Sequence, residues 1–229
     1  MGDILRVASY NLRDFKDDAD AAARVVRTIK PDVLCLQEVP RHLLASNRIA
    51  SFAARCGLFW SGGYRGSGGT TVMASLRLDA GRVRLVPLKV ARLQRERGYA
   101  VSEVRLPGHQ VVSFVSIHLS LDADERARHA AIVMEAVAGK EPIVVAGDLN
   151  EGSDGGAWMS IAGRLPVVTS DTPTFPARNP RHRLDAIFAS PDLSVVPSGL
   201  IELDPTDRMA ATDHLPVWVD LDLSGLALR

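Results

Sequence analysis

Short apolar runs alternate along the chain with longer stretches in which apolar residues recur every three or four positions. The runs are rich in β-branched residues and end at Gly, Pro or charged residues, as strands do. They predict strands over residues 4–10, 33–36, 70–76, 83–88, 99–106, 111–117, 143–146, 184–189 and 217–223. The helical spacing predicts helices over residues 18–29, 41–56 and 122–138, the last with Asp122 as its N-cap.

Adjacent strands flanked by helices predict an α/β fold in which two sheets pack face to face with helices outside. The chain has 229 residues, a length that fits one large domain. No segment is long, polar and Pro/Gly-rich enough to be an interdomain linker, and the Gly/Ser-rich stretch 61–69 is short enough to be a loop. We therefore predict a single domain over residues 1–229.

The composition is that of an ordinary globular protein without a charge surplus. Hydrophobic residues make up 46% of the chain and charged residues 24%, which supplies enough apolar material for a sizeable core. Lys plus Arg and Asp plus Glu are equal at 27 each, so the formal net charge is zero. Proteins that hold long nucleic acids through their phosphates usually carry a basic surplus, so this balance disfavours that class, although a local basic patch would still serve.

Several features of the chain predict a cytoplasmic protein. Asp3 and Arg6 put charges where a signal peptide needs an uninterrupted apolar run. No stretch approaches the roughly 18–20 apolar residues of a membrane span. Cys35 lies inside an apolar run and predicts a buried thiol, and with only Cys56 besides it the chain has no disulfide framework.

Two predicted strands are followed directly by acidic residues. Glu38 follows the strand at 33–36, and Asp148 with Asn150 follows the strand at 143–146. Ligand crevices of α/β sheets lie at the carboxyl ends of strands, and a carboxylate beside an amide suits a hard divalent cation. The alternatives are a solvated strand end for Glu38 and an Asx-type turn for Asp148 and Asn150.

Two histidines lie next to predicted strands. His118 follows the strand at 111–117, and His214 precedes the strand at 217–223. A lone histidine is usually structural, but a partner carboxylate would fix its tautomer and stabilise its charged ring, as catalytic histidines require. Asp185 is placed to be the partner of His214 if its strand lies beside the last one.

These pieces together resemble the endonuclease/exonuclease/phosphatase superfamily, whose members include deoxyribonuclease I-like enzymes, neutral sphingomyelinases and inositol-polyphosphate phosphatases. The resemblance extends from Ser9 to Trp218, and six short motifs in order carry it. They are Ser9-Tyr10-Asn11-Leu12, Leu36-Gln37-Glu38-Val39, Ile117-His118-Leu119, Gly147-Asp148-Leu149-Asn150, Arg183-Leu184-Asp185 and Thr212-Asp213-His214-Leu215-Pro216-Val217. The resemblance implies a four-layer α/β sandwich of two mixed sheets with helices outside, and metal-dependent hydrolysis of phosphoric esters.

The resemblance also implies which residues bind the metal. Glu38 is the principal Mg²⁺ ligand, with Mn²⁺ as a possible substitute. Asn11 lies beside Glu38, and Asp213 completes the metal side of the site. Arg13 replaces an acidic residue that abasic-site endonucleases carry, which disfavours a second metal and an abasic-site role.

Catalytic and substrate-binding roles follow from the same resemblance. Asp148 orients or deprotonates the attacking water, and Asn150 holds the nucleophile or a phosphate oxygen. His118 and His214 hydrogen-bond the scissile phosphate, and Asp185 supports His214. Arg97 matches a family arginine that often points at phosphate, within the charged run 92–97, which is otherwise expected to be a solvated loop.

The leading interpretation is a Mg²⁺-dependent phosphodiester hydrolase whose substrate is a nucleic acid or a small phosphodiester. A phosphomonoesterase acting on an inositol- or sugar-phosphate-like substrate is the second hypothesis. A monoester site needs additional Lys or Arg for the extra negative charge, and Arg13, Arg65 and Arg97 leave the choice open. The third is a catalytically silent binding module, against which the intact set of polar residues argues. Phe175 is expected to pack against the fold, with stacking on a base or sugar as the alternative. No protein partner is predicted.

Overall fold

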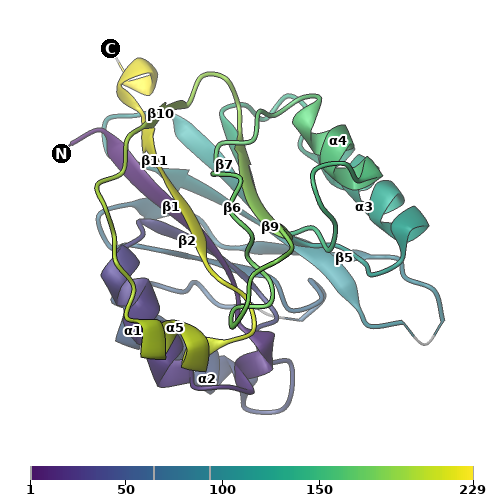
Figure 1. Ribbon diagram of the computed structural model, residues 1–229. Coiled ribbons are helices and arrows are strands. Elements are labelled where there is room, and N and C mark those ends of the chain that lie inside the picture. The colour runs from purple at the N-terminus through teal and green to yellow at the C-terminus, as the bar shows by residue number, and fades with distance from the viewer. Residues whose placement is uncertain (1, 64, 93, 229) are drawn as a thin grey trace.

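Two β-sheets packed face to face form the centre of the molecule, and helices cover the outer face of each sheet (Figure 1). The computed structural model describes residues 2–63, 65–92 and 94–228. The arrangement confirms the predicted four-layer α/β sandwich, and both sheets are mixed.

The first sheet has five strands in the order β10-β11-β1-β2-β3. Only β1 and β2 run parallel, and the other neighbours are antiparallel. The strands are β1 (Ile4–Asn11), β2 (Val33–Gln37), β3 (Thr71–Ala74), β10 (Ser194–Val196) and β11 (Val217–Asp222).

The second sheet has six strands, with the order β4-β6-β7-β8-β9 and β5 paired to β6. Here β7 and β8 are parallel and the other pairs are antiparallel. The strands are β4 (Asp79–Ala80), β5 (Arg84–Leu88), β6 (Arg97–Arg105), β7 (Val111–His118), β8 (Ile143–Asp148) and β9 (Asp185–Ala189).

The described residues form five α-helices, which make up the outer layers (Figure 1). The helices α1 (Ala19–Ile29), α2 (Ala45–Cys56) and α5 (Pro205–Ala211) lie on the first sheet, and α3 (Ala123–Ala136) and α4 (Gly156–Ala162) lie on the second. Asp122 caps α3 as predicted, because its carboxylate accepts a hydrogen bond from the backbone N–H of Glu125 at 2.9 Å. Two short 3₁₀ helices occupy Arg13–Phe15 and Ser224–Leu226.

The layer between the sheets changes character along each strand. Side chains alternate between the two faces of a strand, so residues two apart share a face. The faces that meet are apolar over most of their length and become polar where the strands reach one end of the layer. The sequence along that face is Leu5, Val7, Ser9, Asn11 on β1; Phe114, Ser116, His118 on β7; and Val144, Ala146, Asp148 on β8.

The structure differs from the sequence-based prediction mainly at element ends and in short elements. Strands β7 and β8 each continue into the predicted site residues, because His118 and Asp148 still pair with each other across the sheet. The second helix begins at Ala45 rather than at residue 41, since Leu44 has a φ of 75° and cannot continue a right-handed helix. The seven-residue helices α4 and α5 and the short strands β4 and β10 were not predicted, because segments so short carry little periodicity.

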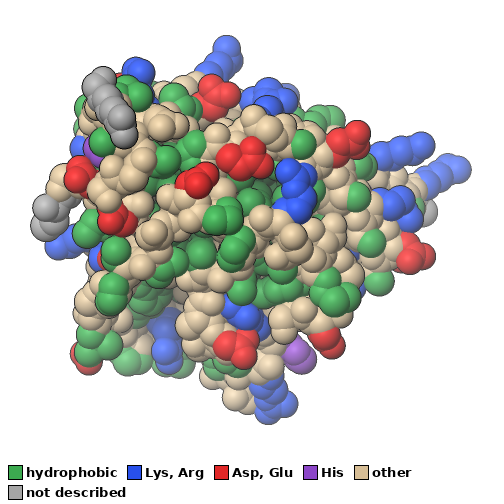
Figure 2. All heavy atoms as spheres, turned by 90° about the horizontal axis from the view of Figure 1, so that it is seen from above, with side chains coloured by type: hydrophobic (Ala, Val, Ile, Leu, Met, Phe, Trp, Pro, Cys, Tyr) green, Lys and Arg blue, Asp and Glu red, His purple; other side chains and the backbone are tan. Residues whose placement is uncertain are grey.

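The end of the molecule where both termini lie is opposite the polar end of the sheet layer (Figure 1). Figure 2 shows this end, with hydrophobic side chains near its middle and charged side chains around them. Among the described residues, none of the helices has both the length and the apolar character to cross a membrane.

Candidate active site

Polar side chains from strands far apart in the sequence meet at one end of the sheet layer. Asn11 ends β1, His118 ends β7, Asp148 ends β8 and Asp185 begins β9. The strand register sets three of them side by side, since His118 pairs with Asp148 and Asp148 pairs with Asp185. All four side chains are buried. The sequence-predicted residues are therefore brought together at this end.

Glu38 reaches this end through an unusual backbone turn. The residue before it, Gln37, already faces the layer between the sheets, so regular alternation would point Glu38 to the opposite face. A φ of 50° at Glu38 breaks that alternation, and its carboxylate lines the same cleft as Asp148. Non-glycine residues at positive φ are uncommon and costly, and they cluster at functional sites.

A different constraint acts just before Asp148. Gly147 lies within β8 rather than in a turn. A Cβ atom at this position would lie 2.0 Å from the backbone oxygen of Ile117 on β7. Glycine is therefore required for the close approach that sets Asp148 beside His118.

Asn11 links the two predicted carboxylates. Its amide Nδ2 donates to Asp148 Oδ2 at 2.9 Å and lies 3.5 Å from Glu38 Oε1. The amide oxygen accepts the backbone N–H of Arg13 at 3.0 Å, which fixes the orientation of the amide. One layer deeper, Gln37 donates to Ser9 and Ser116 and so joins the two sheets below the site.

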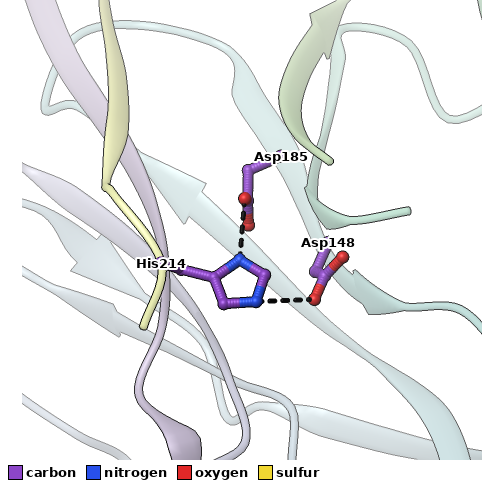
Figure 3. Close-up of side chains that lie close together, drawn as sticks. All are labelled: Asp148, Asp185 and His214. Atoms are coloured by element: carbon purple, nitrogen blue, oxygen red, sulfur yellow. Dashed lines mark hydrogen bonds and ion pairs between the residues drawn. The ribbon is translucent and has the colours of Figure 1, made fainter. Parts of the chain in front are cut away.

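His214 forms a buried pair with Asp185, as the sequence predicts. Its Nδ1 lies 2.9 Å from Asp185 Oδ2, which also accepts the hydroxyl of Thr174 at 2.6 Å. The other ring nitrogen, Nε2, lies 3.7 Å from Asp148 Oδ2 (Figure 3). The ring thus lies between two carboxylates, with Nε2 directed at Asp148.

His118, at the end of β7, faces Asp148 and Glu38. Its Nε2 lies 3.5 Å from Asp148 Oδ2 and 3.9 Å from Glu38 Oε1, whereas Nδ1 has no hydrogen-bond partner among the described residues. Because Nε2 faces only acceptors, a neutral His118 carries its proton on that atom. His118 is therefore positioned as a donor.

Burial and neighbouring charges separate the protonation states of the three groups. Burial lowers the pKa of His118 well below its usual range, and the positive charges of Arg97 and His214 act in the same direction. Burial also lowers the pKa of His214, but the charges of Asp185 and Asp148 outweigh it and raise that pKa. Burial and the charge of Asp185 raise the pKa of Asp148. The site holds a neutral His118, a cationic His214 and an unusually basic carboxylate.

The polar side chains line a cleft of about 230 Å³. Arg97, at the start of β6, lines this cleft and is only 6% exposed, yet its Nη1 has no hydrogen-bond partner among the described residues. A buried guanidinium nitrogen left unpaired is costly, and an anionic ligand could satisfy it. Asn150 also lines the cleft, with a φ of 54°, and its amide donates to the Leu119 carbonyl at 2.9 Å.

Two groups of ligands in this end could hold a metal. Glu38 with Asn11, and Asp213 on the cleft wall, form the set that the sequence predicts. Asp148, Asp185 and His214 form a second set, whose ligand atoms lie within 4.8 Å of one another. In the second set His214 is already hydrogen-bonded to Asp185, which suits proton transfer better than coordination. A carboxylate at the cleft with an amide beside it fits a hard divalent cation that keeps most of its waters.

Asp213 and Arg13 interact with each other across the edge of the site. Arg13 Nε lies 3.2 Å from Asp213 Oδ2, and the same guanidinium also pairs with Asp17. Asp213 lines the cleft, and its ion-pair partner among the described residues is Arg13 rather than a residue of the Glu38 side. Arg13 therefore forms an ion pair with the Asp213 carboxylate and lies beside the cleft wall.

Three contacts complete the site, and the sequence did not predict the partners of any of them. Arg95 was expected to be solvated, but its Nη1 lies 2.9 Å from Glu38 Oε2. The hydroxyl of Thr174 holds the Asp185 carboxylate, and the ring of Phe175 packs against that of His214 at a centroid distance of 4.8 Å. Phe175 thus packs against the fold, as expected, while also lining the cleft. Of these residues, the sequence singles out Phe175 but not Thr174 or Arg95.

Comparison with known proteins places the fold among phosphoesterases. The sequence profile described as "Endonuclease/Exonuclease/phosphatase family" matches residues 8–214. A solved endonuclease/exonuclease/phosphatase from Beutenbergia cavernae DSM 12333 is 25% identical, with a TM-score of 0.76 over 96% of this chain and 72% of that chain. No curated protein sequence matches this chain.

Two further solved structures share the fold at lower identity. A mannosyl-6-phosphatase from Bacteroides thetaiotaomicron VPI-5482 is 19% identical, with a TM-score of 0.72 over 95% of this chain and 99% of that chain. The human nocturnin catalytic domain with bound sulfate is 18% identical, with a TM-score of 0.69 over 96% of this chain and 95% of that chain. At these identities the likeness shows the fold alone.

Proposed function

The chain belongs to the endonuclease/exonuclease/phosphatase family, and on that premise we propose that it is a Mg²⁺-dependent phosphodiester hydrolase. One observation carries the proposal. Asp148, at the end of β8, and His214, in the segment that leads into β11, face each other across 3.7 Å in a cleft that also holds Glu38. A carboxylate, an imidazole and a metal-binding carboxylate in one small cleft suit hydrolysis of a P–O bond.

Asp148 is the group that acts on the attacking water. Its raised pKa makes it a better proton acceptor than an ordinary carboxylate. Asn150 N–H donates to Asp148 Oδ1 at 2.9 Å, and Asn11 donates to Oδ2, so both oxygens are held in place. We assign Asn150 to positioning the water or a phosphate oxygen, because it lines the cleft beside Asp148.

The two histidines and Arg97 stabilise the negative charge of the phosphate. His214 is cationic and is oriented by Asp185, so its Nε2 proton can stabilise a phosphoryl oxygen. His118 is neutral and offers its Nε2 proton to another oxygen. Arg97 offers an unpaired guanidinium nitrogen to the same anion.

Glu38 holds the metal in this proposal, with Asn11 beside it and Asp213 on the cleft wall. When bound there, Mg²⁺ would supply positive charge for the phosphoryl oxygens and an ordered shell of water. Mn²⁺ prefers the same oxygen ligands and is the expected substitute.

The substrate is a nucleic acid or a small phosphodiester. A phosphomonoesterase that acts on a sugar-phosphate-like substrate is the alternative, and it is favoured by Arg95 and Arg97 together in the cleft, because a monoester carries more negative charge. The two can be separated with purified protein and Mg²⁺ or Mn²⁺, offered bis-p-nitrophenyl phosphate, p-nitrophenyl phosphate and supercoiled plasmid. Turnover of diesters alone supports the first proposal, and turnover of the monoester alone supports the second.

The site assignment is tested on the same substrates with His214→Ala and Asp148→Ala. Both variants should lose activity and keep the fold, measured by circular dichroism. His42→Ala is the matched control, since His42 is exposed and lies outside the cleft. If both site variants kept full activity, the assignment would be wrong. If the unchanged protein turned over none of these substrates with either metal but still bound a ligand, a silent binding module would replace the hydrolase.

A further inference from the structure

Arg95 lies between two carboxylates at the mouth of the cleft. Its Nη1 lies 2.9 Å from Glu38 Oε2, and its Nη2 pairs with Asp14. Asp14 follows β1 in a short 3₁₀ turn, and its backbone N–H donates to the Glu38 carbonyl at 2.6 Å. The side chain of Arg95 is 38% exposed, so it is free to change its contacts without disturbing the core.

The chain segment that carries Arg95 is anchored on its outer side by α3. The buried carboxylate of Glu125 accepts the backbone N–H of Ala91 at 2.6 Å and the hydroxyl of Ser120 at 2.8 Å. One helical turn later, His129 Nε2 donates to the Lys89 carbonyl at 2.9 Å. These contacts fix the start of the segment between β5 and β6.

The other end of the segment is anchored in the fold. Arg97 is buried, and a Cβ atom on Gly98 would lie 2.6 Å from the backbone of Ser67. With both ends held, Arg95 must remain near the cleft whichever carboxylate it contacts. The geometry suits a side chain that changes partners in place.

The contact with Glu38 conflicts with the role that the proposed function gives to this carboxylate. Oε1 of Glu38 lies near Asn11 and His118, and Oε2 is occupied by Arg95. A cation that takes Glu38 therefore competes with the Arg95 guanidinium for the same charge. The Arg95 guanidinium can keep its ion pair with Asp14 when it leaves Glu38.

Once released from Glu38, Arg95 could bind an anionic group in the same cleft. Arg95 and Arg97 both line it, and Arg97 already has an unpaired guanidinium nitrogen there. Two guanidinium groups beside His118 and His214 form a site for a phosphate group.

Building on the proposed function, we propose that Arg95 couples metal binding to phosphate binding. It neutralises Glu38 while no metal is bound, and it turns to the phosphate group of the substrate when a divalent cation takes Glu38. The metal and the phosphate thereby favour each other's binding through one side chain, and the coupling is reciprocal. Arg95 is a substrate-binding residue in the loaded site and a competitor of the metal in the empty one.

Arg95→Gln tests this with two ligands measured separately and without turnover. Mn²⁺ alone is titrated and followed by electron paramagnetic resonance, and inorganic phosphate is titrated by calorimetry at saturating Mg²⁺. Losing an exposed ion pair that competes for Glu38 should tighten Mn²⁺ binding roughly two- to fivefold. Losing a charged hydrogen bond to the anion should weaken phosphate binding roughly five- to tenfold.

The opposite signs separate this role from a structural one, because general damage to the site would weaken both ligands. Arg95→Lys keeps the charge and should fall between the unchanged protein and Arg95→Gln for both ligands. Arg92→Gln is the control for loss of charge alone, since Arg92 is exposed on the same segment and forms no ion pair with any residue that the structure describes. It should change neither affinity by as much as twofold.

The possible failures are distinguishable. If the unchanged protein binds Mn²⁺ but Arg95→Gln binds it equally or more weakly, the coupling is wrong while the proposed function stands. Unchanged phosphate affinity in Arg95→Gln, or no phosphate binding by the unchanged protein, would also overturn the coupling. If the unchanged protein binds no Mn²⁺ at millimolar concentration, both proposals fall together.

Discussion

The two ends of the layer between the sheets are built on the same strands and differ in what they bury. On β7, Phe114 and His118 lie four residues apart on one face, and both are buried. Phe114 packs among Val144, Ile187 and other apolar side chains, whereas His118 faces carboxylates. Burying apolar surface stabilises a fold, and burying charged groups costs free energy unless they are paired.

The difference shows how the molecule supports a polar site inside a sheet sandwich. The apolar end supplies hydrophobic stabilisation. The polar end lowers the free energy of unfolding, because it buries polar groups whose hydrogen bonds are incomplete. Arg97 Nη1, His118 Nδ1 and Asp185 Oδ1 are all buried without a hydrogen-bond partner among the described residues. Changes at the polar end should therefore affect activity more than stability, and changes at the apolar end should do the reverse.

The largest expected effect is from Asp148→Asn at the polar end. The amide keeps the shape of the carboxylate but cannot accept a proton, so kcat/KM should fall about 10²- to 10⁴-fold on any phosphodiester that the protein hydrolyses. The melting temperature should be unchanged or higher, because burial already disfavours the charged form of Asp148. Steady-state kinetics and thermal unfolding test the two halves. A large loss of stability with a proportionate loss of activity would contradict the claim that the polar end serves activity more than stability.

Phe114→Ala tests the apolar end. Removing a fully buried aromatic ring leaves a cavity, and the free energy of unfolding should fall by about 3–5 kcal/mol in a denaturant titration. At a temperature where the variant is folded, kcat/KM should stay close to that of the unchanged protein. Phe114→Leu, which loses less volume, serves if Phe114→Ala does not fold. A severe drop in kcat/KM of fully folded Phe114→Leu would show that the two ends are not separable.

Thr174→Val should give a smaller effect at the polar end. Its hydroxyl donates to the Asp185 oxygen that also contacts His214, and a hydrogen bond to a charged group is worth about 1.5–3 kcal/mol. Without it, kcat should fall roughly 10- to 100-fold, because Asp185 would orient His214 less well. Thr174→Ser keeps the hydroxyl and is the matched control. Equal kcat for the two variants would mean that Thr174 has no part in orienting the pair.

Much of this arrangement could be predicted from the sequence. The short apolar runs predicted most of the strands, and the polar residues at strand ends indicated one shared end of the sheets. Asp185 and His214 form the pair that the motifs implied. These features could be predicted because the pleat and the register of the strands both follow from the local pattern of residues.

Other features depend on contacts that no local pattern encodes. Arg95 lies in a charged run, and its pairing with Glu38 depends on how α3 holds the segment before it. The requirement for glycine at position 147 comes from the backbone of a neighbouring strand. The 3₁₀ turn after β1 brings Asp14 next to Glu38. Its positive φ values could not be predicted from its residue types.

The central claim is that Glu38 marks the metal-binding side of the site, and Asp148 with His214 the proton-transferring side. Crystals soaked in Mn²⁺ test it directly through anomalous scattering. The account predicts a peak next to the Glu38 carboxylate, with Arg95 moved away from Oε2. A peak among Asp148, Asp185 and His214, with none at Glu38, would contradict it.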